Sequence, residues 1–290
     1  MKTIFDNKYS EKDDKKLIVE AKGGSKTALE QLIKRHYNFI YNIAIRFVLS
    51  PVDAQDLTQE VVIKIITKLS SYNNKSSFST WLYRITFNHF LNSKRNKMEQ
   101  VIVSFDEYGN ALNNIQSEEL TAQEQIDYNE KIEDAKIGCM TGMLLCLDRK
   151  QRLVYILGEM FEIKSVIGAE LLDISSENFR KILSRARKDL YNFMNNKCGL
   201  VNLNNPCRCP KKTKGFIKEG WVNVADLQFN NHFINKISEI SIEKSNACDT
   251  IMEEKYGKLF KEHPYYDKDK SNEIVSGLME DKELQQIYNL

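Results

Sequence analysis

The sequence predicts an all-α protein built from small helical domains. Apolar residues recur at three- and four-residue steps in several segments, which is the spacing of a buried helical stripe. Only 4 Pro and 12 Gly occur among the 290 residues, and no segment shows the strong two-residue alternation of a half-buried β-strand. A chain of this length has room for two or three such domains, each with a core of its own.

The first predicted domain covers residues 15–97 and contains three amphipathic helices. The first helix spans residues 25–49 and is ended by Ser50 and Pro51. The second begins near Asp53, which we expect to be its N-cap, and its exposed face carries Asp53, Asp56, Gln59 and Glu60. The third follows a polar break and continues to about residue 97, with a cap supplied by Ser79 or Thr80.

The third helix places aromatic residues on every side, in the run SSFSTWLYRITFNHF at residues 76–90. At 3.6 residues per turn, two of its faces can be buried, and these hold Leu82, Ile85 and His89, and Tyr83, Phe87 and Phe90. The remaining face combines an aromatic ring, a cation and an amide in Trp81, Arg84 and Asn88. Such groups stack on unpaired bases and neutralise phosphate. The alternative is that Trp81 fills the core and Arg84 pairs with a neighbouring acid.

The net charge of +2 conceals two strongly charged segments. Residues 106–134 hold nine acids and one Lys, a net charge of −8, and residues 180–218 hold eleven bases and one Asp, a net charge of +10. A local positive charge of this density favours phosphate binding. The alternative is that both segments are solvated helix faces.

An acidic linker is predicted over residues 98–134, because its apolar periodicity is weak. A second helical domain follows over residues 135–197. Within it, Asp148 and Gln151 have the spacing of a capping box ahead of an apolar helix. A short helix at 166–172 and a second one from 176 to about 195 then predict a helix-turn-helix.

The second helix of this motif has the composition of a recognition helix. Its first turn, with Ser176, Glu177, Asn178 and Arg180, would face base edges in the major groove. Its outer face is basic and would lie against backbone phosphates, through Lys181, Arg185, Arg187 and Lys188. The alternative is an ordinary αα-hairpin with a solvated basic face.

A C-terminal extension of unknown role covers residues 198–290, with two or three amphipathic helices predicted from Phe229 onward. Its cysteines Cys198, Cys207 and Cys209 follow a Cys-x8-Cys-x-Cys pattern, whereas zinc sites usually show Cys-x2-4-Cys pairs. We therefore expect no metal or other cofactor, with these three cysteines as the weak candidates for zinc or a thiol switch. Scattered His residues predict no catalytic site, so we expect the chain not to be an enzyme.

The location predicted for the chain is the cytoplasm. The N-terminus has no apolar segment typical of a signal peptide, and no run of about 18 apolar residues predicts a membrane span. The six cysteines are then expected to be reduced thiols rather than a disulfide framework.

Two motifs in the same order and at the same spacing resemble one family. The run DAQDLTQEVVIKIITKL followed by SSFSTWLYRITFNHFLNSKR resembles the polymerase-binding and promoter-melting region of bacterial sigma factors of the extracytoplasmic-function class. The run LSRARKDLYNF resembles the duplex-reading region of the same family. The resemblance covers about residues 15–97 and 135–196, and the family's members bind the core RNA polymerase and direct promoter recognition, DNA melting and transcription initiation.

The resemblance implies roles for particular residues. Asp53, Asp56, Gln59 and Glu60 would dock on the β′ clamp helices of the polymerase, and the helix-turn-helix domain on the β flap. The melted promoter strand would lie on Phe78, Ser79, Thr80, Trp81, Arg84 and Asn88, with Lys94 and Arg95 on phosphates. The linker would run through the active-site cleft, where its acids mimic nucleic acid.

The helix-turn-helix departs from the family pattern. Val166, Ile167 and Ile182 stand where the family commonly has two acids and an Arg. An Arg that contacts guanine or phosphate contributes about 1–3 kcal/mol of readout. We therefore expect the helix-turn-helix and the C-terminal extension to depend on a recruiting or regulatory protein. The alternative function is a helix-turn-helix regulator that binds duplex operators and never joins polymerase.

Overall fold

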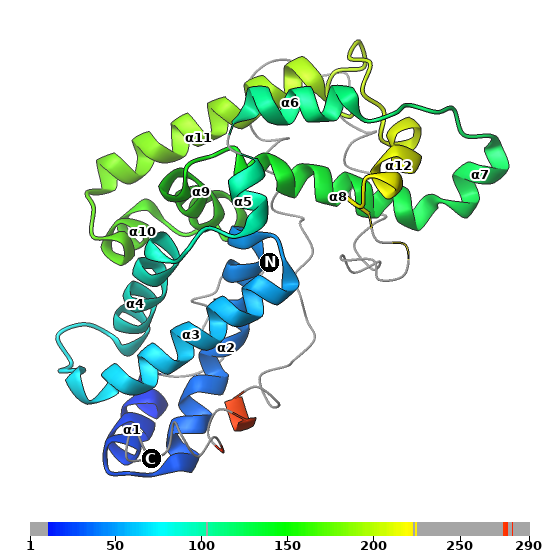
Figure 1. Ribbon diagram of the computed structural model, residues 1–290. Coiled ribbons are helices and arrows are strands. Elements are labelled where there is room, and N and C mark those ends of the chain that lie inside the picture. The colour runs from blue at the N-terminus through cyan, green and yellow to red at the C-terminus, as the bar shows by residue number, and fades with distance from the viewer. Residues whose placement is uncertain (1–10, 103, 223, 225–274, 278–279, 281–290) are drawn as a thin grey trace. The chain divides into compact units, whose positions relative to one another are not determined.

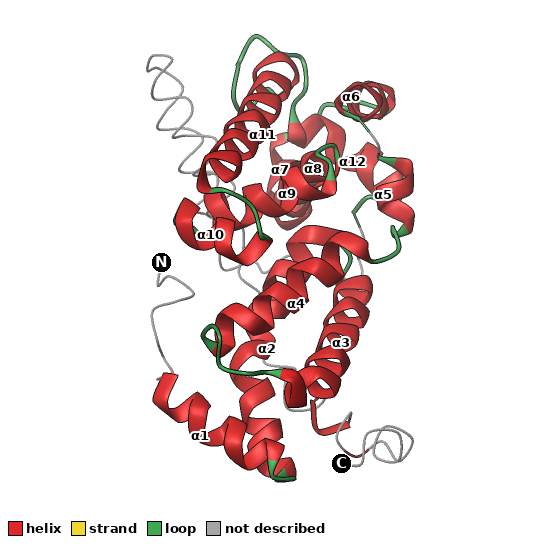
Figure 2. Ribbon diagram, turned by 90° about the vertical axis from the view of Figure 1, so that its left-hand side faces the viewer, coloured by secondary structure: helices red, strands yellow, loops and turns green. Residues whose placement is uncertain are grey.

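The computed structural model describes residues 11–102, 104–222, 224, 275–277 and 280. In this part of the chain all regular structure is helical, apart from one isolated parallel bridge between Cys198 and Cys207, which confirms the predicted all-α class (Figures 1 and 2). None of the described helices is long and apolar enough to cross a membrane. The chain divides into two compact units, which are described separately.

The first unit comprises Met1–Lys94, Lys164–Ser176 and Tyr266–Leu290. Its described helices are α1 (Glu11–Lys22), α2 (Lys26–Val48), α3 (Pro51–Lys68), a 3₁₀ turn (Leu69–Ser71), α4 (Phe78–Asn92) and α10 (Ser165–Leu172). Their apolar stripes meet in one core, in which residues at most 1% exposed include Ile33, Ile40, Phe47, Val61, Ile65 and Phe87. Burial of this kind stabilises the fold by about 1.5–3 kcal/mol per large apolar side chain.

The helix caps of the first unit differ from the predicted ones. The N-cap of α3 is Ser50, whose hydroxyl accepts from the backbone N–H of Asp53. Pro51 occupies the first helical position, where its fixed φ suits the helix and its missing N–H leaves no bond unmade. Asp53 is therefore not the cap but lies in the first turn, where its negative charge interacts favourably with the positive end of the helix dipole. Ser77 likewise caps α4, instead of Ser79 or Thr80.

The helix α4 is shorter than predicted, because it ends at Asn92 and not near residue 97. At this end the hydroxyl of Ser93 donates to the carbonyl oxygen of Phe90 at 3.0 Å. Short polar side chains that bond the nearby backbone compete with helix continuation. A separate helix, α5, then begins at Lys97.

The second unit comprises Arg95–Ile163 and Glu177–Tyr265. Its described elements are α5 (Lys97–Val101), α6 (Phe105–Asn114), α7 (Ala122–Asp127), α8 (Asn129–Leu145), α9 (Arg149–Tyr155), a π-helical turn (Ile156–Met160), α11 (Ser176–Lys197) from its second residue, and α12 (Cys209–Lys218). The core contains Leu144, Leu153, Tyr155, Leu157, Phe179 and Leu190, each at most 1% exposed.

The segment 98–134, predicted as a linker, is largely helical. It contains α5, α6, α7 and the start of α8, and it packs as part of the second unit. Tyr108 on α6 is 2% exposed, and its hydroxyl donates to the carbonyl oxygen of Cys139 at 2.9 Å. Helices of five to ten residues show too few turns for their apolar period to stand out. The missed signal was the capping box of Thr121 and Glu124, which starts α7.

Other sequence predictions for the second half are met. The capping box of Asp148 and Gln151 starts α9, and the two helices of the predicted helix-turn-helix are α10 and α11. The compact units do not follow the predicted domain boundaries, because α10 belongs to the first unit and nearly all of α11 to the second. Most of the helices predicted from Phe229 onward lie outside the described residues.

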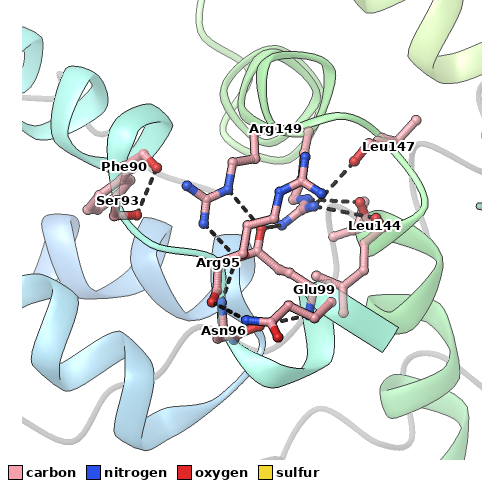
Figure 3. Close-up of polar contacts among 11 residues, drawn as sticks. Phe90, Ser93, Arg95, Asn96, Glu99, Leu144, Leu147 and Arg149 are labelled. Carbon is pink, nitrogen blue, oxygen red and sulfur yellow. Dashed lines mark hydrogen bonds and ion pairs between the residues drawn. The ribbon is translucent and has the colours of Figure 1, made fainter. Parts of the chain in front are cut away.

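A buried carboxylate joins α5 to the start of α9 (Figure 3). Glu99 is 3% exposed and accepts from Arg149 Nε at 3.0 Å, from Arg149 Nη2 at 2.6 Å and from Arg152 Nη1 at 2.8 Å. Arg152 also donates to the last carbonyl oxygens of α8 and the residues after it, at Leu144, Leu145 and Leu147. Burial alone would raise the pKa of Glu99, but the two guanidinium groups hold it below 4.5.

Replacing this carboxylate should destabilise the second unit. Glu99→Gln leaves Arg152 buried without a counter-charge, so we expect unfolding free energy to fall by about 3–5 kcal/mol at pH 7. Urea unfolding followed by circular dichroism measures this loss, and Glu130→Gln, at an exposed position of α8, should change it by less than about 0.5 kcal/mol.

The same difference should depend on pH with a defined sign. Because the pKa of Glu99 is lower in the folded state, its contribution is complete above pH 4.5 and is lost as the pH falls through the folded value. The gap between wild type and Glu99→Gln should therefore be full at pH 7 and shrink below pH 4.5. A gap that stays constant down to pH 3 would contradict this account.

Candidate nucleic-acid interface

The four predicted acidic-face residues lie on one side of α3. Asp56 and Glu60 are exposed, and Asp53 and Gln59 are half-buried. The opposite side of the helix is buried in the core of the first unit through Ala54, Leu57, Thr58 and Val61. Residues three and four apart share a helix face, so the four polar side chains form a continuous acidic strip.

Glu60 is held in place by a buried histidine on α4. Nε2 of His89 lies 2.8 Å from Oε2 of Glu60, and Nδ1 lies 2.6 Å from Nζ of Lys64. Burial, and then the Lys64 charge, lower the pKa of His89 below 6.5, although Glu60 opposes them. The neutral ring fits both contacts when Nε2–H donates to Glu60 and Nδ1 accepts from Lys64. The sequence placed His89 on a buried face but held no signal for this contact.

The three residues predicted to bind single-stranded DNA, Trp81, Arg84 and Asn88, lie on the outer face of α4 and differ in their exposure. Asn88 is exposed, and Trp81 and Arg84 are half-buried. The Trp81 ring lies 5.4 Å from the ring of Tyr72 and 5.6 Å from that of Phe78, measured between centroids. Arg84 Nε donates to the backbone carbonyl oxygen of Glu170 on α10 at 2.9 Å, and so bonds the main chain and not an acidic side chain.

Phe78 lies in the core rather than on the predicted strand-binding face. It is 2% exposed, and its ring makes edge contacts with His36 and Tyr72 at centroid distances of 5.5 Å. A base could stack on it only if the core opened. Ser79 and Thr80 are half-buried in the first turn of α4, and Lys94 and Arg95 follow the helix as exposed residues.

Helix α11, the predicted recognition helix, exposes its predicted polar side. Its opposite face is buried through Phe179, Leu183, Ala186 and Leu190. Ser176 is half-buried, and the exposed residues are Glu177, Asn178, Arg180, Lys181, Arg185, Arg187 and Lys188. Two of these cations have acidic partners within the chain.

Those two pairs differ in strength. Lys181 and Glu177 form an exposed pair at 2.7 Å, which contributes little. Arg187 contacts buried Glu159, on the π-helical turn, through Nη2 at 2.5 Å and Nε at 2.6 Å. The guanidinium of Arg187 is thereby fixed on the surface of α11.

The basic residues of α12 are paired with the acidic segment of the same chain. Lys214 Nζ lies 2.5 Å from Oε1 of Glu118 and 2.8 Å from Oε1 of Glu124, and Lys211 pairs with Glu119. Within the basic run at 180–218, Lys211 and Lys214 are thus paired with acids of the same chain, whereas the bases of α11 and Lys218 of α12 are exposed.

The cysteine candidates do not form a metal site in the described part of the chain. No group of three or more His, Cys, Asp or Glu side chains there is arranged to hold a metal ion. Cys198 and Cys209 are buried and Cys207 is half-buried, all as free thiols. Burial raises the pKa of Cys198 to about 11, so its thiol is protonated at neutral pH, which disfavours both metal binding and nucleophilic reactivity.

Comparisons with known proteins agree with the first of the two motifs. The family model for Sigma-70 region 2 matches residues 32–99, which begin in α2 and run through α3 and α4 to α5. The chain is 30% identical to RNA polymerase sigma factor YlaC of Bacillus subtilis over 165 residues, 56% of this chain and 90% of that protein.

Two further relatives and one solved structure are similar. The ECF RNA polymerase sigma factor SigW of Bacillus subtilis is 26% identical over 182 residues, 61% of this chain and 94% of that protein. The RNA polymerase sigma-H factor of Pseudomonas aeruginosa is 34% identical over 79 residues, 27% of this chain and 41% of that protein. The structure of CnrH in complex with the cytosolic domain of CnrY is 19% identical with a TM-score of 0.43, over 63% of this chain and 97% of that one, which is too distant to support an inference.

The match to YlaC, at 30% identity, covers nearly all of that sigma factor. This chain therefore belongs to the extracytoplasmic-function class of RNA polymerase sigma factors.

Proposed function

We propose that this sigma factor docks on the polymerase core through the acidic strip of α3 and holds the opened promoter strand on the outer face of α4. The observation that carries the proposal is that both surfaces belong to one unit and lie on helices matched by the region 2 family model. The chain itself would need no catalytic group, because the polymerase performs the chemistry.

The acidic strip fits a basic protein partner. A protein that binds DNA gains nothing for that task from exposed carboxylates at Asp56 and Glu60, since phosphates repel them. The β′ clamp helices of the polymerase are the proposed partner. Close charge pairs across an interface couple by about 1.5–7 kcal/mol, so two well-placed acids can decide the binding.

The outer face of α4 fits single-stranded DNA. The half-buried ring of Trp81 is held against Tyr72 and Phe78 and keeps part of its surface accessible. Stacking of a base on such a ring contributes about 1–3 kcal/mol, which offsets the few kcal/mol needed to unstack a base. Asn88 would contact base edges, and Lys94 and Arg95 would contact phosphates. Arg84 would exchange the Glu170 carbonyl for a phosphate.

Duplex recognition is assigned to α11, with the β flap as the proposed polymerase contact of this region. Arg180 and Arg185 are exposed arginines of α11, whereas Arg187 is exposed but bound by Glu159. Val166 on α10 is 66% exposed at a position where the family commonly has an acid. This apolar side chain supports the proposal that a recruiting or regulatory protein assists promoter binding.

Charge reversal on α3 tests polymerase docking. Asp56→Lys combined with Glu60→Lys should weaken binding to core polymerase by at least about tenfold, because two attractive pairs become repulsive. Affinity for promoter duplex should stay unchanged or rise. Co-elution and fluorescence anisotropy measure the two affinities separately, and Glu20→Lys on the exposed side of α1 serves as the control. Unchanged polymerase binding would favour the operator-binding alternative.

Removal of the Trp81 ring tests strand capture. Trp81→Ala should reduce open-complex formation by about 5- to 150-fold, the equivalent of one lost stacking contact, with little change in polymerase binding. Permanganate reactivity of promoter thymines measures the opening. Trp81→Phe, which keeps a ring, should restore much of it, whereas equal loss of opening and polymerase binding would make Trp81 a core residue.

His89 is predicted to position Glu60 for docking. His89→Leu removes the Nε2–H donor, and freeing one long side chain at an interface costs about 0.5–1.5 kcal/mol, or about two- to twelvefold in affinity. In a Glu60→Ala background the same change should have no further effect on polymerase binding. Additive effects of the two substitutions would show that His89 acts through general stability.

A further inference from the structure

Helix α12 is bound to residues 115–124, called the segment below, by polar contacts near both ends of the segment. Besides the pairs of Lys214 and Lys211, the backbone N–H of Glu118 donates to the carbonyl oxygen of Lys211 at 2.8 Å. Lys212, which is 7% exposed, donates to the carbonyl oxygens of Ile115 and Asn113. Its ammonium group therefore binds main-chain oxygens at the end of α6 and at the start of the segment.

Apolar contacts support the same docking. Leu120 of the segment, Ile132 of α8 and Cys209 of α12 form one buried cluster, with Tyr128 and Leu200 packed against it. Figure 1 shows α12, in yellow, beside α8. Leu120 thus anchors the segment between α8 and α12, and α12 belongs to the C-terminal extension.

The backbone of α12 touches the segment at Gly215. A Cβ at this position would lie 2.6 Å from the carbonyl oxygen of Gln116 and 2.6 Å from Cγ2 of Ile115. Real Cβ atoms do not approach backbone so closely, so any larger residue must push the helix and the segment apart. Close approach of two backbones is a specific reason for glycine here.

The ion pairs between α12 and the segment also shift the pKa values of their members. Hydrogen bonds from Lys214 and Thr121 lower the pKa of Glu124 from 4.5 to about 2. The bonds to Glu118 and Glu124 raise the pKa of Lys214 above 10.5. Three acids of the segment are thereby occupied by two lysines of α12, and the segment is not available as an acidic strand.

We propose that α12 is an internal clasp, which holds residues 115–124 on the second unit and must release them before the chain can form an active polymerase complex. This inference rests on the proposed function and on the expectation, implied by the family resemblance, that the segment belongs to a linker that enters the polymerase cleft. The same carboxylates cannot pair with Lys211 and Lys214 and also face the polymerase. The C-terminal extension therefore restrains the sigma factor through its own linker.

Hydrogen–deuterium exchange of the full-length protein tests whether the clasp exists. Lys214→Glu should increase amide exchange over residues 115–124 by about tenfold or more, since it replaces two attractive pairs by repulsion. Lys218→Glu, at an exposed position of the same helix, should leave it unchanged. Gly215→Ala should increase exchange without changing any charge. Exchange equal to wild type in both Lys214→Glu and Gly215→Ala would overturn the clasp.

Transcription with core polymerase tests the restraint. Initiation at limiting sigma factor should rise severalfold in Lys214→Glu and in Gly215→Ala. A triple variant that adds Glu118→Lys and Glu124→Lys to Lys214→Glu should re-form the ion pairs with reversed charges and lower amide exchange again. Faster exchange with initiation no higher than wild type would overturn the restraint. If wild type and variants alike fail to bind core polymerase, both the proposed function and the need for release are wrong. The exchange data would still show whether α12 holds the segment.

Discussion

The second unit depends on one buried carboxylate. Glu99 binds two arginines of α9, and one of these, Arg152, satisfies carbonyl oxygens that the end of α8 leaves without partners. A carboxylate with this many charge-assisted bonds fixes the direction in which α9 leaves α8. The chain then passes through the π-helical turn, whose Glu159 binds Arg187 on α11. Two ion-pair clusters, at Glu99 and at Glu159, thus help to fix the positions of α5, α9 and α11 relative to one another.

Charge has two separate uses in this chain. Exposed acids on α3 and exposed bases on α11 lie on the protein surface, while Glu118, Glu119 and Glu124 pair with Lys211 and Lys214 of α12. The net charge of +2 conveys neither use. The two uses differ in tertiary pairing. Because Lys211 and Lys214 bind acids of the same chain, part of a basic run that resembles a nucleic-acid-binding segment is an internal contact.

The sequence was sufficient for features that depend on local chemistry. The predicted helix at 25–49 matches α2, the Asp148 capping box matches the start of α9, and the acidic residues of α3 share one face as expected. Each follows from helical periodicity or from bonds between residues three or four apart.

Features that depend on distant contacts could not be predicted. The burial of Phe78 depends on His36 and Tyr72 from other parts of the first unit, and Lys214 meets Glu118 across 96 positions of sequence. A charge run shows that partners exist but not which ones. The short helices α5, α6 and α7 were missed because a helix of one to three turns buries too few residues to show a period.

The sequence separation of the α12 contacts also has a consequence for protein synthesis. Glu118 leaves the ribosome 96 residues ahead of Lys214. At about 5–20 residues per second, the acidic segment is present for about 5–20 s before its lysine partners are made. Every newly synthesised molecule therefore begins with the segment unpaired, and α12 can close on it only after Lys214 has been made.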